Sequence, residues 1–307
     1  MTDVARAERS LTVVVAAWND PELLHMCLRS LAARQGSVAL EVIVACAEGR
    51  GFEAALAELP EATLVSMPAD ATVPVLRAAG LSRASGDVVA FLEDHATVAP
   101  TWADALMESY GAPGVRAVGG PVAQAPGMST LDWGAYLFDY GRFMPPMAAG
   151  PTRELSGLNM SFTRELLEAL GDTFRDGVIE GPLHEELVRR GVRPHLAPGA
   201  VVYQTKRYSL RETLVSVYYL GRGYAGRRVL GAARIARLAR VSGSVLLPAV
   251  LVWRVLTAAL PKGENTGRVL GAVGYLCLIA LAWSLGEGVG YVAGVGDSET
   301  RWRRGDA

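Results

Sequence analysis

Five short apolar runs that alternate with helical patterns constrain the fold of this chain more than any other feature of its sequence. The runs are apolar on both faces and rich in β-branched residues, which is typical of strands buried inside a sheet. They are LTVVVAA (11–17), LEVIVAC (40–46), TLVSM (63–67), DVVAFL (87–92) and VRAVGG (115–120). Helical spacing of apolar residues predicts helices between them, at 21–33, 52–59, 73–84 and 101–109. This alternation predicts an α/β domain with a parallel sheet and right-handed crossovers.

Three titratable side chains follow one of these predicted strands, in the stretch FLEDHATVAPTW (91–102). Ligands of parallel α/β sheets bind outside the carboxyl ends of the strands. On an extended strand the side chains at i and i+2 point the same way, so we expect Glu93 and His95 to converge on one ion while Asp94 faces elsewhere. A carboxylate with an imidazole suits a divalent ion such as Mn²⁺. A solvated polar turn is the alternative.

The middle of the chain breaks the alternation. Residues 123–150 contain Pro, Gly, Met and aromatic residues and predict a long functional loop with a short helix, or else a packed insertion without function. Further on, Pro182 suits the first turn of a helix and Gly191 its C-terminal cap. Glu180 is therefore expected just ahead of a helix N-terminus.

Composition excludes some classes of function. With 20% charged residues and a net charge of −1, the chain is not expected to bind nucleic acid. Its three widely spaced cysteines fit neither a disulfide framework nor a zinc site, which suits a reduced compartment. The first ten residues, MTDVARAERS, lack the apolar core of a signal peptide, so the folded part is expected in the cytosol.

Two apolar segments near the C-terminus, 241–260 and 269–294, are each about long enough to span roughly 30 Å of hydrocarbon. The first contains Pro248 and Arg254, and a lone Arg in a span costs about 2.5–3.5 kcal/mol, which suggests a tilted, re-entrant or snorkelling segment. A mean hydropathy of +0.23 fits such segments. Two buried helices of a soluble domain are the alternative.

Arginines flank this pair on both sides: Arg222, Arg227, Arg228, Arg234, Arg237 and Arg240 before it, and Arg301, Arg303 and Arg304 after it. The positive-inside tendency then predicts a transmembrane hairpin with cytosolic flanks and the turn 261–267 on the far side. Residues 208–228 mix Tyr, Leu and Arg at helical spacing and predict an interfacial helix. The expected division is the α/β domain (1–207), an amphipathic helix and linker (208–240), the hairpin (241–295) and a cytosolic tail (296–307).

One motif within this region is rejected. Gly221-Arg-Gly-Tyr-Ala-Gly226 matches the G-x-G-x-x-G pattern of dinucleotide sites. No predicted strand precedes it, so it lacks the strand–turn–helix context that such a site requires.

The order of several sequence blocks resembles that of family 2 glycosyltransferases with the GT-A fold, over roughly residues 10–230. The blocks are LTVVVAAWNDPELLHMCLRSL, EVIVACAEG, VLRAAGLSRASGDVVAFLEDHATVAPTW, ELSGLNMSFTRELLEALG and IEGPLHEELVRRGVRPHLAPGAVVYQ. The resemblance implies a nucleotide-diphospho-sugar transferase fold of Rossmann-like type. It also implies an inverting, metal-dependent enzyme with a nucleotide-sugar donor.

The resemblance assigns residues to roles. FLEDHATVAPTW is similar to the aspartate-rich metal motif in its D-x-H form, which implies that Glu93 and His95 hold Mn²⁺ or Mg²⁺ against the nucleotide diphosphate. Arg77 and Gly80 match the Arg-x-x-Gly block beside the nucleotide. The segment that lines the sugar and acceptor site is matched by Gly157 and Asn159. The other positions expected to contact the nucleotide are Ala16, Asn19, Glu48 and Asp94.

Counting back from Gly191, Glu180 falls at the position of the family's catalytic base, which takes the proton from the acceptor hydroxyl. His184 and Glu185, within one turn, are competing candidates. A helix-terminal carboxylate favoured by the helix dipole is the alternative.

The chain departs from the family pattern at four places. Cys46 and Ala47 stand where Asp residues usually read the base or ribose, and Glu48 can substitute from the next position. Gln204 replaces a His that is a metal ligand in some relatives, which implies weaker metal affinity. Glu180 is one methylene longer than the usual Asp, which requires a compensating shift of the backbone.

Together these features predict a membrane-attached inverting glycosyltransferase with its catalytic domain at the cytoplasmic face of the cell membrane. The expected acceptor is a saccharide or a lipid-linked saccharide, as in polysaccharide or glycolipid biosynthesis. A catalytically inactive GT-A-fold protein that serves as a membrane scaffold or binding protein is the alternative, because the acidic residues at 46–47 are missing.

Overall fold

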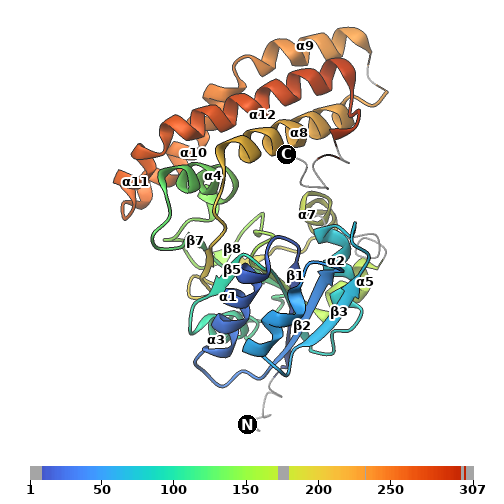
Figure 1. The fold of residues 1–307 in the computed structure, drawn as a ribbon, viewed down its shortest axis with the longest axis vertical. Coiled ribbons are helices and arrows are strands. Elements are labelled where there is room, and N and C mark those ends of the chain that lie inside the picture. Colours follow the sequence, from blue (N-terminus) through green and yellow to red (C-terminus); the bar gives the residue numbers. More distant parts are fainter. Residues whose placement is uncertain (1–8, 172–179, 232, 299–300, 302–307) are drawn as a thin grey trace. The chain divides into compact units, whose positions relative to one another are not determined.

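The computed structural model describes residues 9–171, 180–231, 233–298 and 301, and the chain divides into two compact units (Figure 1). Unit 1 comprises Met1–Ala123 and Pro145–Thr205, and unit 2 comprises Gln124–Met144 and Lys206–Ala307. Unit 1 carries the sheet and unit 2 is helical. The segment around residues 124–144 therefore belongs with the C-terminal helices, although it interrupts the sequence of unit 1.

Unit 1 is built on an eight-stranded sheet in the order β3-β2-β1-β4-β9-β6-β10-β8. The strands are β1 (Leu11–Ala17), β2 (Leu40–Ala47), β3 (Thr63–Met67), β4 (Val88–Glu93), β6 (Ala117–Gly119), β8 (Gly150–Pro151), β9 (Met160–Thr163) and β10 (His195–Leu196). The first four pair in parallel, as the sequence predicts. The expectation of an all-parallel sheet is wrong beyond β4, because β9 is antiparallel to both β4 and β6. The chain reaches β9 after a long excursion rather than through a crossover helix, so the strand can enter from the opposite end.

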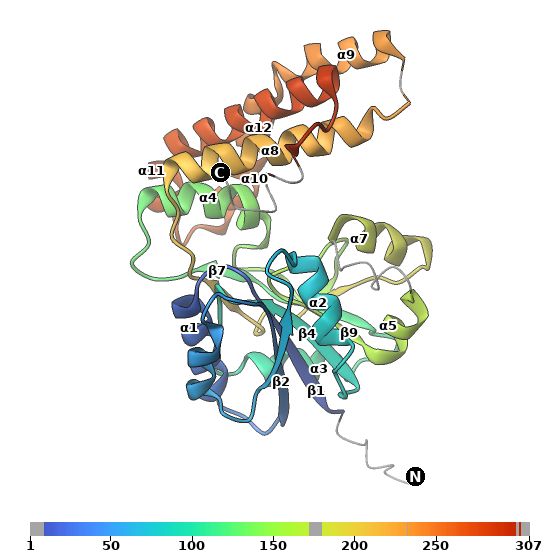
Figure 2. The same ribbon diagram turned by 45° about the vertical axis from the view of Figure 1, so that its right-hand side comes forward.

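Helices cover both faces of this sheet (Figure 2). They are α1 (Pro21–Ala32), η1 (Phe52–Glu58), α2 (Val73–Leu81), α3 (Trp102–Ser109), α5 (Arg164–Leu170) and α7 (Glu180–Arg189). Leucines of α5 and α7 pack with Val14 of β1 and Phe91 of β4 in one core cluster, while α1 lies on the other side of the sheet. The predicted segment 52–59 forms a 3₁₀ helix. The predicted helix before Gly191 is α7, and Gly191 has a φ of 68°, as expected of a residue beyond a helix C-terminus.

A second, three-stranded sheet fixes the chain that follows β4. Its order is β5-β11-β7, with β5 at Ala96–Val98, β7 at Val122–Gln124 and β11 at Val202–Gln204. Gln204 is the antiparallel partner of Ala96. The next residue, Thr205, donates hydrogen bonds from its backbone N (2.9 Å) and its Oγ1 (2.8 Å) to the carbonyl oxygen of His95. Two hydrogen bonds from one residue therefore hold the carbonyl oxygen of His95.

Unit 2 consists of helices. They are α4 (Thr130–Tyr140), η2 (Gly141–Phe143), α8 (Leu210–Arg228), α9 (Arg234–Ser244), α10 (Leu247–Ala259), η3 (Leu260–Lys262), α11 (Thr266–Gly271) and α12 (Val273–Ala293). The short helix expected in 123–150 is α4, which begins with a capping box of Ser129 and Asp132. The segment 241–260 is divided between α9 and α10, and Pro248 lies in the first turn of α10.

Glycines bring α8 and α12 into direct backbone contact. A Cβ on Gly286 would lie 2.1 Å from the carbonyl oxygen of Tyr218, and a Cβ on Gly290 would lie 2.4 Å from that of Arg222. From the other helix, a Cβ on Gly221 would lie 2.4 Å from the carbonyl oxygen of Trp283. The glycines of the rejected G-x-G-x-x-G motif thus lie within a helix, and Gly221 permits a close helix–helix contact.

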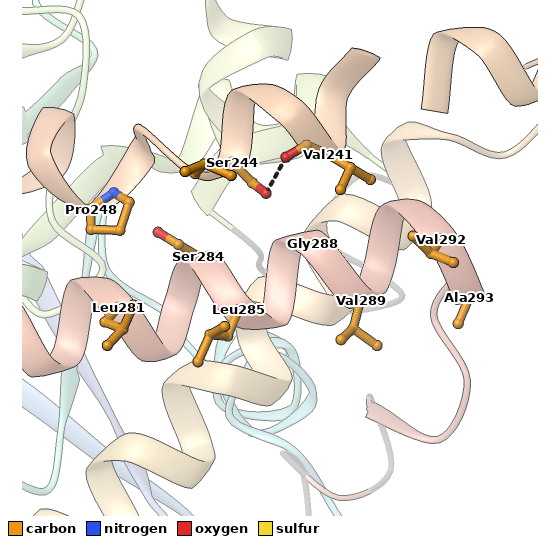
Figure 3. Close-up of a pocket in the computed structure, with 11 residues that line it drawn as sticks. Val241, Ser244, Pro248, Leu281, Ser284, Leu285, Gly288, Val289, Val292 and Ala293 are labelled. Atoms are coloured by element: carbon orange, nitrogen blue, oxygen red, sulfur yellow. Dashed lines mark hydrogen bonds between the residues drawn. The ribbon is translucent and has the colours of Figure 1, made fainter. Parts of the chain in front are cut away.

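One helix of unit 2 is long and apolar enough to cross a membrane by length and composition among the described residues. It runs over Thr266–Ala293 with a mean hydropathy of 2.0. An apolar groove of about 580 Å³ lies beside it in unit 2 (Figure 3). Its lining includes Val245 and Pro248 on one side and Leu281, Leu285 and Val289 of α12 on the other.

The glycine contact generates a prediction about the stability of unit 2. Gly286→Ala forces a Cβ against a backbone oxygen, so we expect a loss of about 1–3 kcal/mol in the free energy of unfolding. Gly274→Ala on the same helix is the matched control, because nothing lies within 4 Å of the added methyl group, and its effect should stay within about 1 kcal/mol. Denaturant unfolding followed by circular dichroism measures both. Equal stabilities would contradict the close approach of the two helices.

Candidate active site

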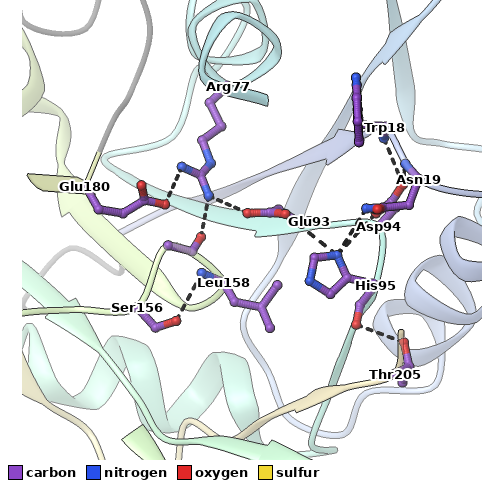
Figure 4. Close-up of polar contacts among 11 residues, drawn as sticks. Trp18, Asn19, Arg77, Glu93, Asp94, His95, Ser156, Leu158, Glu180 and Thr205 are labelled. Carbon is purple, nitrogen blue, oxygen red and sulfur yellow. Dashed lines mark hydrogen bonds and ion pairs between the residues drawn. The ribbon is translucent and has the colours of Figure 1, made fainter. Parts of the chain in front are cut away.

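The carboxyl ends of β1 and β4 bring the candidate site together. Ala16 of β1 is the parallel partner of Glu93 of β4, and the backbone N of Asp94 donates to the carbonyl oxygen of Ala16 at 3.1 Å. The residues that follow the two strands therefore meet at one edge of the sheet. Figure 4 shows Trp18 and Asn19 from one strand end beside Glu93, Asp94 and His95 from the other.

Asp94 is completely buried and fixes the turn after β1. Its Oδ2 accepts hydrogen bonds from the backbone N of Trp18 (2.8 Å) and of Asn19 (2.5 Å), and its Oδ1 accepts one from Asn19 Nδ2 (2.6 Å). Burial alone would raise the pKa of Asp94, but the contacts with His95 and Asn19 outweigh it and hold the pKa below its usual value. The carboxylate therefore stays charged and orders this edge of the sheet.

His95 lies between the two neighbouring carboxylates. Its Nδ1 is 3.7 Å from Glu93 Oε2 and 3.4 Å from Asp94 Oδ1. Glu93 and His95 thus approach each other, as the spacing predicts, whereas Asp94 also remains near the imidazole. The carboxylate of Asp94 nevertheless points mainly to the β1 turn (Figure 4).

The donor set at this edge fits a divalent cation in part. Glu93 and His95 offer an oxygen and a nitrogen, which are donors that Mn²⁺ accepts. No group of three or more His, Cys, Asp or Glu side chains that could hold a metal ion occurs in the described part of the chain. A cation bound by Glu93 and His95 would therefore need other donors, such as phosphate oxygens or water.

Arg77 connects this edge to the second half of the site. It comes from α2, and its side chain is 1% exposed. Its Nη2 donates to Glu93 Oε1 (2.6 Å) and to the carbonyl oxygen of Gly157 (2.9 Å), and its Nη1 donates to Glu180 Oε1 (2.8 Å). One buried guanidinium therefore bridges the predicted metal ligand Glu93 and the predicted base Glu180 (Figure 4).

Two glycines make room for this arrangement. A Cβ on Gly80 would lie 2.3 Å from Val14 Cγ1, so the glycine lets α2 pack directly on β1. This close packing determines how far Arg77, on the same helix, lies from the sheet. A Cβ on Gly157 would lie 1.7 Å from Glu180 Oε1 and 2.8 Å from Arg77 Nη2. Gly157 thus contributes space and a carbonyl oxygen.

Glu180 is the first residue of α7, and its side chain is 41% exposed, so it can reach both Arg77 and solvent. Burial would raise its pKa, but the charge of Arg77 and the hydrogen bond from it lower the pKa below the usual value. The carboxylate is therefore ionised at neutral pH.

His184 and Glu185, the two other candidates for the catalytic base, also lie on α7. The backbone N of Leu155 donates to His184 Nε2 at 3.0 Å, so the lone pair that would take a proton from an acceptor hydroxyl is engaged by the backbone. Glu185 is exposed on α7. Of these three side chains, Glu180 is the one that the structure joins to the metal motif, through Arg77.

Asn159, Ala16 and Glu48 were also predicted to contact the donor or the acceptor. Asn159 is buried and makes three internal hydrogen bonds: Nδ2 donates to the carbonyl oxygens of Pro121 (3.1 Å) and Ala200 (2.8 Å), and Trp102 Nε1 donates to Oδ1 (3.1 Å). Ala16 is buried within β1, whereas Glu48 is exposed just after β2. Asn159 thus supports the framework of the site with all the polar atoms of its side chain.

Trp18 and Arg50 form a further contact at this edge of the sheet, and neither residue was predicted from the sequence. The Arg50 guanidinium lies 5.1 Å from the centre of the Trp18 ring, and Arg50 Nη1 donates to the Trp18 carbonyl oxygen at 2.8 Å. Both residues follow the ends of adjacent parallel strands, β1 and β2. Their positions just after two strand ends could have identified them from the sequence, because ligands of parallel sheets bind at the carboxyl ends of the strands. The Trp18 ring is half-buried there.

Comparison with known proteins shows which family this chain resembles in sequence. Residues 12–171 match the profile of glycosyl transferase family 2. The succinoglycan biosynthesis protein ExoM of Rhizobium meliloti (strain 1021) is 30% identical over 172 residues, which cover 54% of this chain and 55% of that protein. The chain thus spans about half the length of this curated relative.

Solved structures of low sequence identity share the fold. Mannosyltransferase PcManGT from Pyrobaculum calidifontis, in complex with GDP-Man and Mn²⁺, has a TM-score of 0.56 and 20% identity, over 94% of this chain and 88% of that chain. GalNAc-T7 with UDP, GalNAc and Mn²⁺ has a TM-score of 0.51 and 13% identity, over 66% of this chain and 45% of that chain. The predicted α/β fold of GT-A type is confirmed.

The Arg77–Glu180 contact generates a prediction about ionisation. Arg77→Gln removes the two largest causes that lower the pKa of Glu180, so the pKa should rise relative to that in the native protein. Arg77→Lys keeps the charge and should keep the pKa low, and Arg83→Gln, at an exposed arginine, should leave it unchanged. Carboxyl ¹³C NMR titration, with Glu180→Gln to assign the signal, measures these values.

The lowered pKa of Glu180 also makes the stability of the fold depend on pH. Because folding lowers the pKa of Glu180, this contact stabilises the fold above the usual pKa of glutamate and ceases to do so as the pH falls through the lowered pKa. An unchanged pKa of Glu180 in Arg77→Gln would show that the guanidinium does not control it.

Proposed function

The chain belongs to glycosyl transferase family 2, and on that premise we propose that it transfers a sugar, with inversion, from a nucleotide-sugar donor to an acceptor hydroxyl. The observation that carries the proposal is the bridge from Arg77 to both Glu93 and Glu180. It joins a candidate base to a candidate cation site through one buried charge. Two solved structures of the same fold, one in complex with GDP-Man and Mn²⁺ and the other with UDP, GalNAc and Mn²⁺, support the choice of donor.

In the proposed mechanism Glu180 acts as the general base. Its carboxylate accepts the proton of the acceptor hydroxyl while the acceptor oxygen forms a bond to the anomeric carbon. The bond from that carbon to the donor diphosphate breaks on the opposite face, and the electron pair leaves with the diphosphate, so the configuration inverts. Arg77 keeps Glu180 ionised and holds it in place against Gly157.

Glu93 and His95 are proposed to hold a divalent cation, Mn²⁺ or Mg²⁺. When bound, such an ion would neutralise the diphosphate and stabilise it as a leaving group. Asp94 and Asn19 maintain the edge on which these two ligands stand. Gln204, opposite Ala96, occupies the neighbouring position where some relatives carry a His ligand, which favours weaker metal binding here.

The acceptor is proposed to be a saccharide carried by a membrane lipid, with unit 1 at the cytosolic face of the membrane. The apolar composition of α12 and the relation to a protein of succinoglycan biosynthesis support this part. A soluble saccharide acceptor is the other possibility within the same chemistry.

A catalytically silent scaffold is the rival function, motivated by Cys46 and Ala47 at positions where acidic residues are usual. Both are buried at the end of β2. A screen of nucleotide-sugars for thermal stabilisation, with and without Mn²⁺, separates the two, because a bound donor raises the melting temperature by mass action. A scaffold of this kind would show neither Mn²⁺-dependent stabilisation nor turnover.

The base assignment predicts the outcome of one substitution. Glu180→Gln should lower turnover by about 10²- to 10⁴-fold, because the amide cannot accept the proton, while donor binding persists. Glu185→Gln, at an exposed position of the same helix, should retain activity. Turnover in the native range for Glu180→Gln would refute the base but leave the fold intact.

The cation site predicts a second outcome. His95→Ala should weaken Mn²⁺-dependent binding of the nucleoside diphosphate about tenfold or more, since one of two protein ligands is lost. His25→Ala is the matched control, because His25 lies on α1 and pairs with Glu58. Calorimetric titration of UDP and GDP, with and without Mn²⁺, measures both variants. Binding that does not depend on Mn²⁺ in the native protein would contradict the site.

A further inference from the structure

The α8–α12 pair determines how unit 2 can meet a bilayer. The two helices run in the same direction and in constant register: Tyr218 lies against Gly286, Arg222 against Gly290, and Gly226 against Gly294 and Val295. The backbones touch at each of these levels. One helix therefore cannot enter hydrocarbon along its length without taking the other with it.

Charges on α8 exclude such an entry. The helix carries five of them: Arg211, Glu212, Arg222, Arg227 and Arg228. All except Arg222 are exposed, and they occur in both its first and last turns. Charged side chains at both ends and in the body of a helix make it a poor transmembrane element. Because α12 is fixed alongside α8, these charges also oppose a transmembrane position of α12.

The second predicted span is too short. The 13 residues of α10 extend about 20 Å, whereas the hydrocarbon core measures about 30 Å. The break between Ser244 and Leu247 prevents α9 from extending it as one helix. The described helices of unit 2 thus provide no pair of spans for a transmembrane hairpin.

The side of α12 away from α8 is nevertheless strongly apolar and exposed. Leu278, Leu281, Leu285, Val289 and Val292 recur at helical spacing and form one stripe. The groove beside this stripe is shared with the α9–α10 elbow, where Val245 is exposed as well (Figure 3). Trp253 of α10 is 65% exposed. An apolar face of this extent is typical of a membrane or partner surface.

Charge identifies the partner as an anionic lipid surface. Residues 206–301 contain 13 Lys or Arg and five Asp or Glu. Arg240 precedes the groove residue Val241, and Arg254 follows Trp253, so exposed guanidinium groups are adjacent in the chain to residues of the apolar face. Interfacial helices combine an apolar face with such cations, which attract anionic headgroups.

We propose that unit 2 lies in the plane of one leaflet of an anionic bilayer, with the exposed side of α12 and the α9–α10 elbow in the acyl chains and α8 toward the headgroups. No described helix crosses the membrane in this arrangement. The inference rests on the membrane attachment in the proposed function and is independent of the sugar chemistry. It replaces the transmembrane hairpin predicted from the sequence.

The first experiment determines topology with single cysteines in the full-length chain carrying Cys277→Ser. Glu264→Cys marks the turn before α12, Asp297→Cys the region after it, and Glu61→Cys unit 1, all at exposed positions. A membrane-impermeant maleimide is added to inside-out and to right-side-out vesicles of the expressing cells. We expect all three to be labelled in the same vesicle type, because both ends of α12 stay on one side. Labelling of Glu264→Cys or Asp297→Cys from the side opposite to Glu61→Cys would overturn the proposal.

The second experiment measures binding to preformed vesicles of phosphatidylcholine, with and without phosphatidylglycerol. Val292→Glu introduces a charge into the apolar stripe and should lower vesicle binding at least tenfold. Val188→Glu on α7 is matched in residue type and exposure, 66% against 62%, and should bind as the native chain does. We also expect phosphatidylglycerol to strengthen binding.

The outcomes separate this proposal from the proposed function. Native binding by Val292→Glu, or binding that phosphatidylglycerol does not strengthen, would refute the in-plane surface. Failure of the native chain to bind either vesicle would refute membrane attachment as a whole. Nucleotide-sugar turnover, measured on the same samples in detergent, reports on the transfer reaction independently of both results.

Discussion

The guanidinium of Arg77 is the interaction on which the candidate site depends. It contacts Glu93 at the end of β4, Glu180 at the start of α7 and the carbonyl oxygen of Gly157 between them. Glu93 is 16 residues from Arg77 in the chain, whereas Gly157 and Glu180 are 80 and 103 residues from it. The two carboxylates balance the charge of this buried arginine and, with the carbonyl oxygen, accept hydrogen bonds from its Nη1 and Nη2, whereas a partial set would leave a desolvated charge.

This arrangement also orders the surroundings of the site. Gly80 allows α2 to approach β1 closely enough for Arg77 to reach the sheet edge, and Gly157 leaves the space that Glu180 occupies. Asp94 accepts hydrogen bonds from the turn after β1 and so connects that turn to the end of β4. Two buried charged residues, one cationic and one anionic, thus frame Glu93 and His95.

Sequence patterns within a single segment predicted those strands whose conformation depends on their own residues. The runs at 11–17 and 63–67 form strands with those bounds, because long β-branched apolar stretches have few other stable conformations. The strand β9 was not predicted, since four residues carry too little pattern and its antiparallel direction depends on the path of the chain before it. At the site, the positions of Glu93, His95 and Glu180 followed from the motif order. The internal bonds of Asn159 and the Trp18–Arg50 contact depend on neighbours distant in sequence, which no local pattern encodes.

The split of unit 2 into two chain segments has a consequence for synthesis. Ala135 and Phe138 of α4 pack against Val217 of α8 and Ile279 of α12, so the partners of α4 leave the ribosome long after α4 itself. During that interval the apolar side of α4 has no native cover, which is the condition under which nascent chains aggregate or recruit chaperones. The emergence of α12 therefore ends the period during synthesis in which α4 lacks its native contacts.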